Sequence, residues 1–185
     1  SACASLPIEA SELAMAAQIR GAPLAMRRCV TLDLEVPASA DIVVEGRFLP
    51  HERRPEGPFG EFMGNYVEIG PNHVFEVTHV SYRKEAVLHG LLCGSPEDLR
   101  PLEAVTAARV YRAVGAAVPG VIDVSCRPNV MISLINIRKA YEGHAQHVFL
   151  AALASHLDYN KVVIVVDEDV DIHDLDDVMW AYLTR

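Results

Sequence analysis

Several features that define whole classes of protein are missing or scarce in this sequence of 185 residues. The longest apolar-rich run without a charged residue, 143–157, is shorter than the roughly 20 residues that a membrane-spanning helix needs, so we expect no membrane span. Positive charge is also scarce, since 16 lysines and arginines oppose 25 aspartates and glutamates, for a net charge of −9. A surface of that sign repels a phosphate backbone, which argues against a nucleic-acid partner.

Closely spaced cysteines are missing as well, because no C-x-x-C motif occurs among the four, which are Cys3, Cys29, Cys93 and Cys126. This spacing is typical of reduced, mostly buried thiols in a cytoplasmic protein rather than of a disulfide framework or a zinc knuckle. The sequence also lacks a glycine-rich phosphate loop, a G-x-S-x-G motif and a basic stretch ahead of an apolar one at Ser1. These absences argue against a phosphate-loop enzyme, a hydrolase and a secretory signal.

What is present is a high apolar content and a change of pattern at Gly94-Ser95-Pro96. Hydrophobic residues make up 51% of the chain, which is enough to form a core. The first part predicts one helix and a largely antiparallel sheet, and the second part predicts alternating strands and helices in a small α/β layer. We therefore expect an α+β domain at 1–95 and an α/β domain at 96–185. The expected helices are 11–20, 97–114, 143–157 and 174–183, and the expected strands are 28–36, 41–48, 66–69, 73–83, 86–93, 121–126, 130–137 and 161–166.

Two segments carry more specific expectations about the fold. The charged, proline-rich stretch 50–60 predicts a connection between strands. The run V-V-I-V-V at 162–166 has no alternating polar face, which is typical of a central strand covered on both sides.

The most specific motif is E-G-P-F-G-E, which runs from Glu56 to Glu61. Two glycines and a proline between the glutamates favour a tight, stiff turn that can bring both carboxylates into one small volume. Two carboxylates that share a site cannot both ionise cheaply, so one pKa rises and that group becomes a proton donor near neutrality. On spacing alone, a surface loop with two solvated acids is the more frequent outcome.

This motif, continued as F-M-G-N-Y to Tyr66, resembles the signature of the UbiD-type reversible decarboxylases, which use prenylated FMN. Three further blocks resemble that family in the same order. They are S-E-L-A-M-A-A-Q-I-R-G at 11–21, D-L-E-V-P-A-S-A-D-I-V-V-E-G at 33–46 and V-V-D-E-D-V-D-I-H-D-L-D-D-V-M-W-A-Y-L-T-R at 165–185. The resemblance implies half of a split-barrel-like flavin-binding domain, joined through the helix 97–114 to a small α/β oligomerisation domain, in a cytoplasmic homo-oligomer.

The resemblance also implies roles for individual residues. Glu61 matches the acid that protonates the carbon from which CO₂ has left, and Glu56 matches the glutamate that pairs with an arginine and helps to hold the flavin. Glu12 matches the ligand of a manganese ion that bridges protein and flavin phosphate, for which a carboxylate oxygen is suited. Without the resemblance, Glu12 is an acid favoured by the positive end of a helix. The segment Ser5-Leu6-Pro7 matches, more loosely, the place where the family chain passes the cofactor and a second cation, potassium.

The family's catalytic arginine, its two other metal ligands and most phosphate contacts precede the position matching Ser1. The resemblance therefore implies that this chain is a piece of a larger carboxy-lyase, whose remainder lies on the same polypeptide or on a second one. The implied substrate is an aromatic, heteroaromatic or α,β-unsaturated carboxylic acid. Substrate choice by resemblance falls at 94–104, where Arg100 either meets a polar ring substituent or is a solvated residue at a helix start.

Three alternatives remain open. The chain could be a non-catalytic assembly module whose apolar α/β surface packs against partner subunits. The acidic segment 167–174 resembles a cation loop but has Ile172 and Val178 at the two most demanding EF-hand positions, so capping of the next helix competes with a Mg²⁺ site. His144 and His147 share a helix face without a third nearby ligand, which favours a structural role for both.

Overall fold

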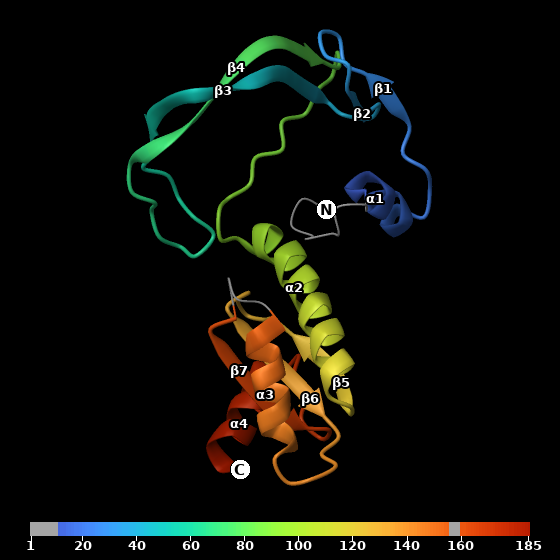
Figure 1. Ribbon diagram of the computed structural model, residues 1–185, viewed down its shortest axis with the longest axis vertical. Coiled ribbons are helices and arrows are strands. Elements are labelled where there is room, and N and C mark those ends of the chain that lie inside the picture. The colour runs from blue at the N-terminus through green and yellow to red at the C-terminus, as the bar shows by residue number, and fades with distance from the viewer. Residues whose placement is uncertain (1–10, 156–159) are drawn as a thin grey trace. The chain divides into compact units, whose positions relative to one another are not determined.

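The computed structural model describes residues 11–155 and 160–185, and the chain divides into two compact units, Ser1–Ser95 and Pro96–Arg185 (Figure 1). Within the described residues, the first unit has antiparallel strands and one helix, and the second has a small sheet with helices on its faces. The mixed α+β and α/β class predicted from the sequence is confirmed. No helix in the described part of the chain is long and apolar enough to cross a membrane.

The N-terminal unit begins with helix α1 (Glu12–Arg20), which both of its flanking residues define. The Ser11 hydroxyl oxygen accepts a hydrogen bond from the N–H of Ala14 at 3.3 Å, which caps the start of the helix. Gly21 ends it in the left-handed conformation, with φ 71°. A short hairpin, β1 (Met26–Arg28) and β2 (Glu35–Pro37), and a long one, β3 (Ile42–Glu56) and β4 (Gly70–Tyr82), follow.

Several strand predictions for this unit are wrong. Residues 28–36 form a hairpin rather than one strand, and 66–69 contribute only a single bridge between Tyr66 and Gly60. No strand is described at 86–93. The stretch 50–60, expected as a connection, continues β3 as far as Glu56. Proline donates no N–H, but it is tolerated in this stretch because each strand of a two-stranded ribbon has one free edge. The stretch also contains an irregularity, since the pairing of β3 with β4 shifts register between Leu49 and Arg53.

The second register shift of the β3–β4 ribbon requires a glycine. It falls between Glu45 and Gly46, where the two strands approach closely. A Cβ at Gly46 would collide with the carbonyl oxygen of Glu76 and with the ring of Phe75. The bulge therefore depends on the absence of a side chain.

Little of the N-terminal unit is buried. Among its described residues, only Val43 and Glu45 are buried, whereas apolar side chains such as Phe48, at 65% exposure, face outward. A two-stranded ribbon is at best marginally stable unless other elements cover it. This unit therefore needs a further packing surface.

The C-terminal unit has a three-stranded sheet in the order β5-β6-β7, with β5–β6 antiparallel and β6–β7 parallel. Its elements are α2 (Pro96–Ala117), β5 (Val121–Ser125), β6 (Ile132–Ile137), α3 (His144–Ser155), β7 (Val162–Asp167) and α4 (Leu175–Thr184). All six elements lie close to their predicted ranges. The V-V-I-V-V run, expected to be central, is instead β7 at the edge of the described sheet, and β6 is the central strand.

Two hydrophobic clusters cover the two faces of this sheet. The first joins the sheet to α2 and α3 through Val110, Val114, Val118, Val124, Cys126, Ile135, Ile137, Val148 and Ala152. The second joins it to α4 through Leu134, Val166, Val170, Ile172, Val178 and Ala181. Neighbouring residues of β6 enter different clusters because side chains alternate across a strand. Each fully buried Val, Leu or Ile contributes roughly 1.5–3 kcal/mol relative to an exposed one.

This distribution of buried residues predicts how the two units behave when separated. Residues 96–185 contain both clusters, so we expect them to unfold cooperatively on heating when expressed alone. Residues 1–95 alone should show no cooperative transition, because their ribbon is uncovered. Near-ultraviolet circular dichroism of both fragments, with the whole chain as reference, measures this. A sharp melting transition in 1–95 would contradict the prediction.

Candidate functional site

The E-G-P-F-G-E motif forms the start of the loop that joins β3 to β4. Gly57 follows the last residue of β3 with φ 105°, a conformation that favours glycine. The loop is then tied to itself, since Gly60 and Tyr66 form an antiparallel bridge and the N–H of Val67 donates to the carbonyl of Phe59 at 3.0 Å. The tight turn predicted within the motif lies instead at its end, where the N–H of Gly64 donates to the carbonyl of Glu61 at 2.9 Å.

The two glutamates of the motif have different surroundings. Glu56 is exposed, and its Oε2 accepts a hydrogen bond from the side-chain amide of Asn72 on β4. Glu61 is half-buried, its Oε1 accepts from the N–H of Phe62 at 2.9 Å, and its own N–H donates to the carbonyl of Asn65 at 2.8 Å. The turn therefore fixes the backbone of Glu61. The sharing of one small volume by the two carboxylates stays a prediction.

Glu45 on β3 is a buried acid that the sequence analysis did not single out. It is 2% exposed, and its two carboxylate oxygens accept from the N–H groups of Val30 and Thr31 at 2.7 Å each. The Thr31 hydroxyl donates to the same carboxylate at 2.6 Å. One buried acid thus holds the loop between β1 and β2. The backbone N–H groups of Val30 and Thr31 bond to Glu45 instead of to a neighbouring strand, so 28–36 does not form the single strand that was predicted.

The Glu45 carboxyl is held strongly in its charged form. The hydrogen bond from the Thr31 hydroxyl, together with the two backbone N–H groups and nearby His79, lowers the pKa of Glu45 from 4.5 to about 2, against the opposing effect of burial. A signal for this residue was available in the sequence. Glu45 lies two residues after Val43 and so faces the same side of the strand as a buried valine.

The residues predicted to hold the cofactor and the metal are only partly described. Glu12 is exposed in the first turn of α1, and a carboxylate there is suited to a hard cation such as Mn²⁺. Ser5, Leu6 and Pro7 lie outside the described residues. Across 11–155 and 160–185, no three His, Cys, Asp or Glu side chains gather closely enough to hold a metal ion. Glu12 can therefore supply one ligand of a site that needs others.

Arg100, weighed above as a substrate contact, pairs with its own helix. Its guanidinium Nη1 lies 2.7 Å from Oε2 of Glu103, which is 3% exposed. Since a buried carboxylate without a partner is costly, this arrangement favours the structural interpretation of Arg100.

The cysteines that the structure describes differ in exposure. Burial raises the pKa of the Cys126 thiol to about 11, so this cysteine is an inert part of the core. Cys29 is half-buried, but Cys93 is exposed, so the expectation of mostly buried thiols is wrong for Cys93.

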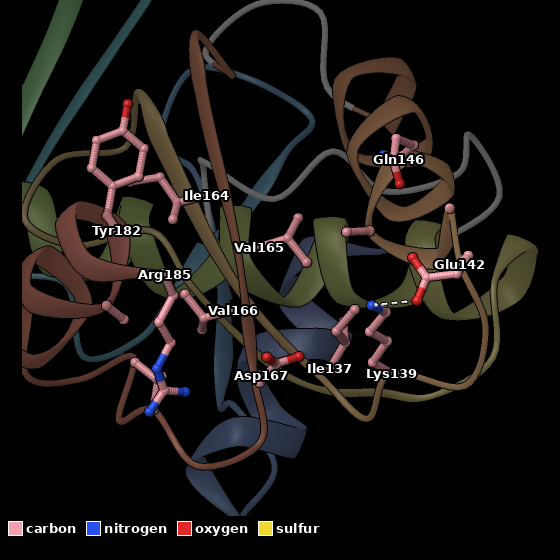
Figure 2. Close-up of a pocket in the computed structure, with 14 residues that line it drawn as sticks. Ile137, Lys139, Glu142, Gln146, Ile164, Val165, Val166, Asp167, Tyr182 and Arg185 are labelled. Carbon is pink, nitrogen blue, oxygen red and sulfur yellow. Dashed lines mark hydrogen bonds and ion pairs between the residues drawn. The ribbon is translucent and has the colours of Figure 1, made fainter.

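The cavity drawn in Figure 2 has a volume of about 390 Å³ and lies within the C-terminal unit. It is bordered by β7, the start of α3 and the end of α4. Glu12, Glu56 and Glu61 do not line it. The residues that line this cavity are therefore different from those to which the family resemblance assigns catalytic or metal-binding roles.

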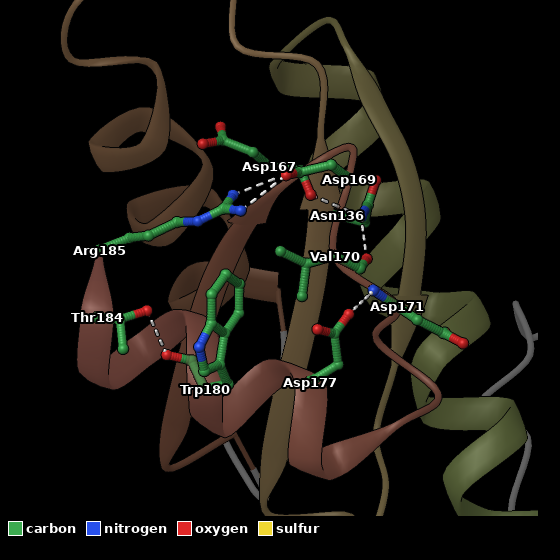
Figure 3. Close-up of polar contacts among 9 residues, drawn as sticks. All are labelled: Asn136, Asp167, Asp169, Val170, Asp171, Asp177, Trp180, Thr184 and Arg185. Atoms are coloured by element: carbon green, nitrogen blue, oxygen red, sulfur yellow. Dashed lines mark hydrogen bonds and ion pairs between the residues drawn. The ribbon is translucent and has the colours of Figure 1, made fainter.

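The acidic segment after β7 is used for structural hydrogen bonds (Figure 3). Asp174 caps the start of α4, as predicted, and Asp177 accepts from the N–H of Asp171 at 2.8 Å. Asp169 receives two hydrogen bonds from the Arg185 guanidinium, at 2.9 and 2.8 Å, which lower its pKa. These contacts support the capping interpretation.

His144 is fully buried, and both of its ring nitrogens meet backbone groups. Nε2 lies 2.8 Å from the carbonyl oxygen of Pro119, and Nδ1 accepts from the N–H of Ala140 at 3.2 Å. Both ring nitrogens are thus used in contacts with the backbone. His147 contacts the Tyr141 hydroxyl at 3.2 Å. The structural role predicted for both histidines is supported.

Comparison with known proteins agrees with the family resemblance seen in the sequence. Residues 1–96 match the 3-octaprenyl-4-hydroxybenzoate carboxy-lyase Rift-related domain, and residues 101–185 match the C-terminal domain of the same enzymes. The UbiD-class enzyme HmfF from Pelotomaculum thermopropionicum, solved with FMN, is 36% identical over 99% of this chain and 42% of its own, with a TM-score of 0.94.

Two further solved structures are similar. The 3,4-dihydroxybenzoic acid decarboxylase AroY of Klebsiella pneumoniae is 31% identical over 100% of this chain and 41% of its own, with a TM-score of 0.87. The vanillic acid decarboxylase of Sedimentibacter hydroxybenzoicus is 30% identical over 99% of this chain and 41% of its own, also with a TM-score of 0.87. The chain thus spans about two fifths of the length of these relatives. Since both family models match and together cover nearly its full length, the chain belongs to the UbiD family.

Proposed function

We propose that this chain carries part of the active site of a prenylated-FMN-dependent carboxy-lyase, which reversibly decarboxylates an aromatic, heteroaromatic or α,β-unsaturated acid. The observation that carries the proposal is the end of the E-G-P-F-G-E segment, where Glu61 is half-buried on a hydrogen-bonded backbone. An acid on a fixed loop is what proton delivery to one defined carbon requires. The relatives solved with FMN or prenylated FMN, and those named as aromatic acid decarboxylases, support the same reaction class.

Each glutamate has a distinct proposed role. Glu61 donates a proton to the carbon that has lost CO₂, and the N–H of Phe62 stabilises the carboxylate that remains after this transfer. Glu56 orients the arginine that the family pairs with it, and Asn72 restrains Glu56 for that purpose. Prenylated FMN, when bound, would supply the electron sink for the electron pair that stays on the substrate carbon when CO₂ leaves.

The cofactor and metal ligands in this chain form only part of a set. Glu12 is a suitable Mn²⁺ ligand because it is an accessible carboxylate, and Ser5, Leu6 and Pro7 are proposed to lie along the flavin. The arginine, the other metal ligands and the potassium site are proposed to need polypeptide outside these 185 residues. The sparse burial of the N-terminal unit supports this, since its ribbon has uncovered apolar side chains.

A second role, assembly of a homo-oligomer, is supported by helix α4. Five large apolar side chains of this helix are exposed, namely Leu175, Met179, Trp180, Tyr182 and Leu183. An exposed apolar face of this kind is typical of a protein interface. We propose that α4 contributes to contacts between subunits in addition to the catalytic role of the chain.

The proposal predicts that catalysis and cofactor binding need the complete subunit. We expect the isolated chain to bind prenylated FMN with a dissociation constant weaker than roughly 10 μM, because most phosphate contacts are supplied elsewhere. The complete subunit should bind it tightly and release CO₂ from at least one member of a panel of aromatic and α,β-unsaturated acids. Flavin fluorescence titration and CO₂ detection measure the two properties.

The matched control is the complete subunit loaded with unmodified FMN, which lacks the modified ring. Micromolar or tighter binding by the isolated chain would contradict the partial-site proposal. A complete, prenylated-FMN-loaded subunit without activity on any acid of the panel would leave assembly as the function.

A further inference from the structure

One turn of the N-terminal unit, at 92–95, lies against the loop that follows β3 (Figure 1). In this turn, which we call the supporting turn, the N–H of Ser95 donates to the carbonyl of Leu92 at 3.0 Å. The φ of Gly94 is 78°, and that of the preceding Cys93 is not positive. This combination is that of a type II turn, in which the third position favours glycine.

The supporting turn contacts the loop on both sides of Glu61. A Cβ added to Gly94 would lie 3.0 Å from the carbonyl oxygen of Phe62, which is closer than an ordinary van der Waals contact. A Cβ added to Gly60 would lie 3.9 Å from the Cβ of Cys93, which is an ordinary contact. The residue before Glu61 and the residue after it therefore both lie against the supporting turn.

Phe62 connects this contact to the carboxylate of Glu61. The N–H of Phe62 donates to Oε1 of Glu61 at 2.9 Å, and the carbonyl oxygen of Phe62 is the atom that faces Gly94. Both groups belong to one residue, and this residue lies inside the tight turn that the N–H of Gly64 closes on the carbonyl of Glu61. A shift of the Phe62 carbonyl would therefore also move the hydrogen-bond donor that holds the Glu61 carboxylate.

We propose that the supporting turn positions Glu61 for proton transfer, and that Gly94 is a positioning residue because a side chain there would push the Phe62 carbonyl away. This inference rests on the proposed function, in which Glu61 protonates the carbon that has lost CO₂. Proton transfer depends steeply on the placement of the acid, and a misplacement of about 1 Å can cost roughly a hundredfold in rate. Gly94 acts through Phe62 and not on the substrate.

The test replaces Gly94 in the complete, prenylated-FMN-loaded enzyme. Gly94→Ala adds the Cβ that crowds the Phe62 carbonyl, and we expect kcat to fall by roughly 10- to 100-fold. KM and flavin content should stay within about twofold of the wild type, because the turn acts on the acid and not on binding. The ratio of kcat in H₂O to kcat in D₂O should rise, since a slowed proton transfer limits the cycle more strongly.

Two further variants separate crowding from backbone strain and from general damage. Asparagine tolerates a positive φ better than alanine but still carries a Cβ, so Gly94→Asn should lose activity as Gly94→Ala does. Gly94→Asn also carries the test if Gly94→Ala fails to retain flavin. The matched control is Gly120→Ala in the C-terminal unit, because Gly120 has φ 81° and an added Cβ would lie 2.9 Å from the carbonyl oxygen of Arg138. This control should lower the melting temperature but leave kcat within about twofold of the wild type.

Three results would overturn the positioning role. Wild-type kcat in both Gly94 variants would mean that the loop needs no support from the turn. An unchanged isotope ratio at lowered kcat would assign the loss to general damage, and a raised KM at unchanged kcat would assign the turn to substrate binding. Glu61→Gln separates this inference from the proposed function. Full activity of Glu61→Gln would contradict the proposed function itself, whereas an impaired Glu61→Gln beside a fully active Gly94→Ala would overturn only the role of the turn.

Discussion

Replacing Glu61 with glutamine in the complete, prenylated-FMN-loaded enzyme is expected to lower the rate of decarboxylation by roughly 10²–10⁴-fold. Glutamine has nearly the same shape and can still accept the hydrogen bond from the N–H of Phe62. It carries no acidic proton, so it cannot protonate the carbon from which CO₂ has left. The loss should therefore affect both steady-state CO₂ release and the exchange of deuterium into the product, because a catalytic cycle cannot be completed without this proton transfer.

The measurement needs a control for general damage to the loop. Glu68→Gln changes an exposed acid in the same β3–β4 connection but outside the motif, and should leave the rate within about twofold of the wild type. Flavin content and melting temperature of all variants show whether the fold and the cofactor are retained. Full activity of Glu61→Gln with normal flavin content would assign the proton to another group.

The second large effect is expected at Glu45, whose carboxylate holds the loop between β1 and β2. In the complete enzyme, Glu45→Gln replaces a charged acceptor of three hydrogen bonds by an amide that can accept with one oxygen only. At least one backbone N–H is then left without its partner. Amide exchange at Val30 and Thr31 should accelerate by roughly tenfold or more.

The same carboxylate gives this loop a defined dependence on pH. The pKa of Glu45 is about 2 in the folded protein and 4.5 in its ordinary state. Because the pKa is lowered, the charged carboxylate stabilises the folded state at pH values above the ordinary pKa of 4.5. That stabilisation is lost as the pH falls from about 4.5 to about 2. Protection of Val30 and Thr31 should therefore be constant from pH 7 to 5 and decline only in stronger acid.

Glu76→Gln is the matched control for Glu45, because Glu76 pairs with Arg47 at 2.8 Å on the surface, where an ion pair contributes little. It should leave the exchange at Val30 and Thr31 unchanged. Unaltered protection in Glu45→Gln would mean that the loop is held by other contacts. Loss of protection already between pH 7 and 5 would contradict the low pKa.

Local sequence alone determined most of the helices and the character of the motif. Ser11 and Gly21 delimit α1, and Asp174 caps α4, because caps act through hydrogen bonds within a few residues of the helix end. Gly57 of the E-G-P-F-G-E motif likewise has a positive φ of 105°, a conformation that glycine adopts without help from distant parts of the chain. The order of the four motif blocks was sufficient to identify the UbiD family.

Tertiary structure decided which strand is central and which groups are buried. An apolar run such as V-V-I-V-V is compatible with a central or an edge position, because periodicity reports burial of faces and not the number of pairing partners. The break at 28–36 depends on Glu45, which is 14 residues away from Thr31 in the sequence. Contacts of that kind arise only when separate strands come together, so the residue pattern within either segment could not reveal them.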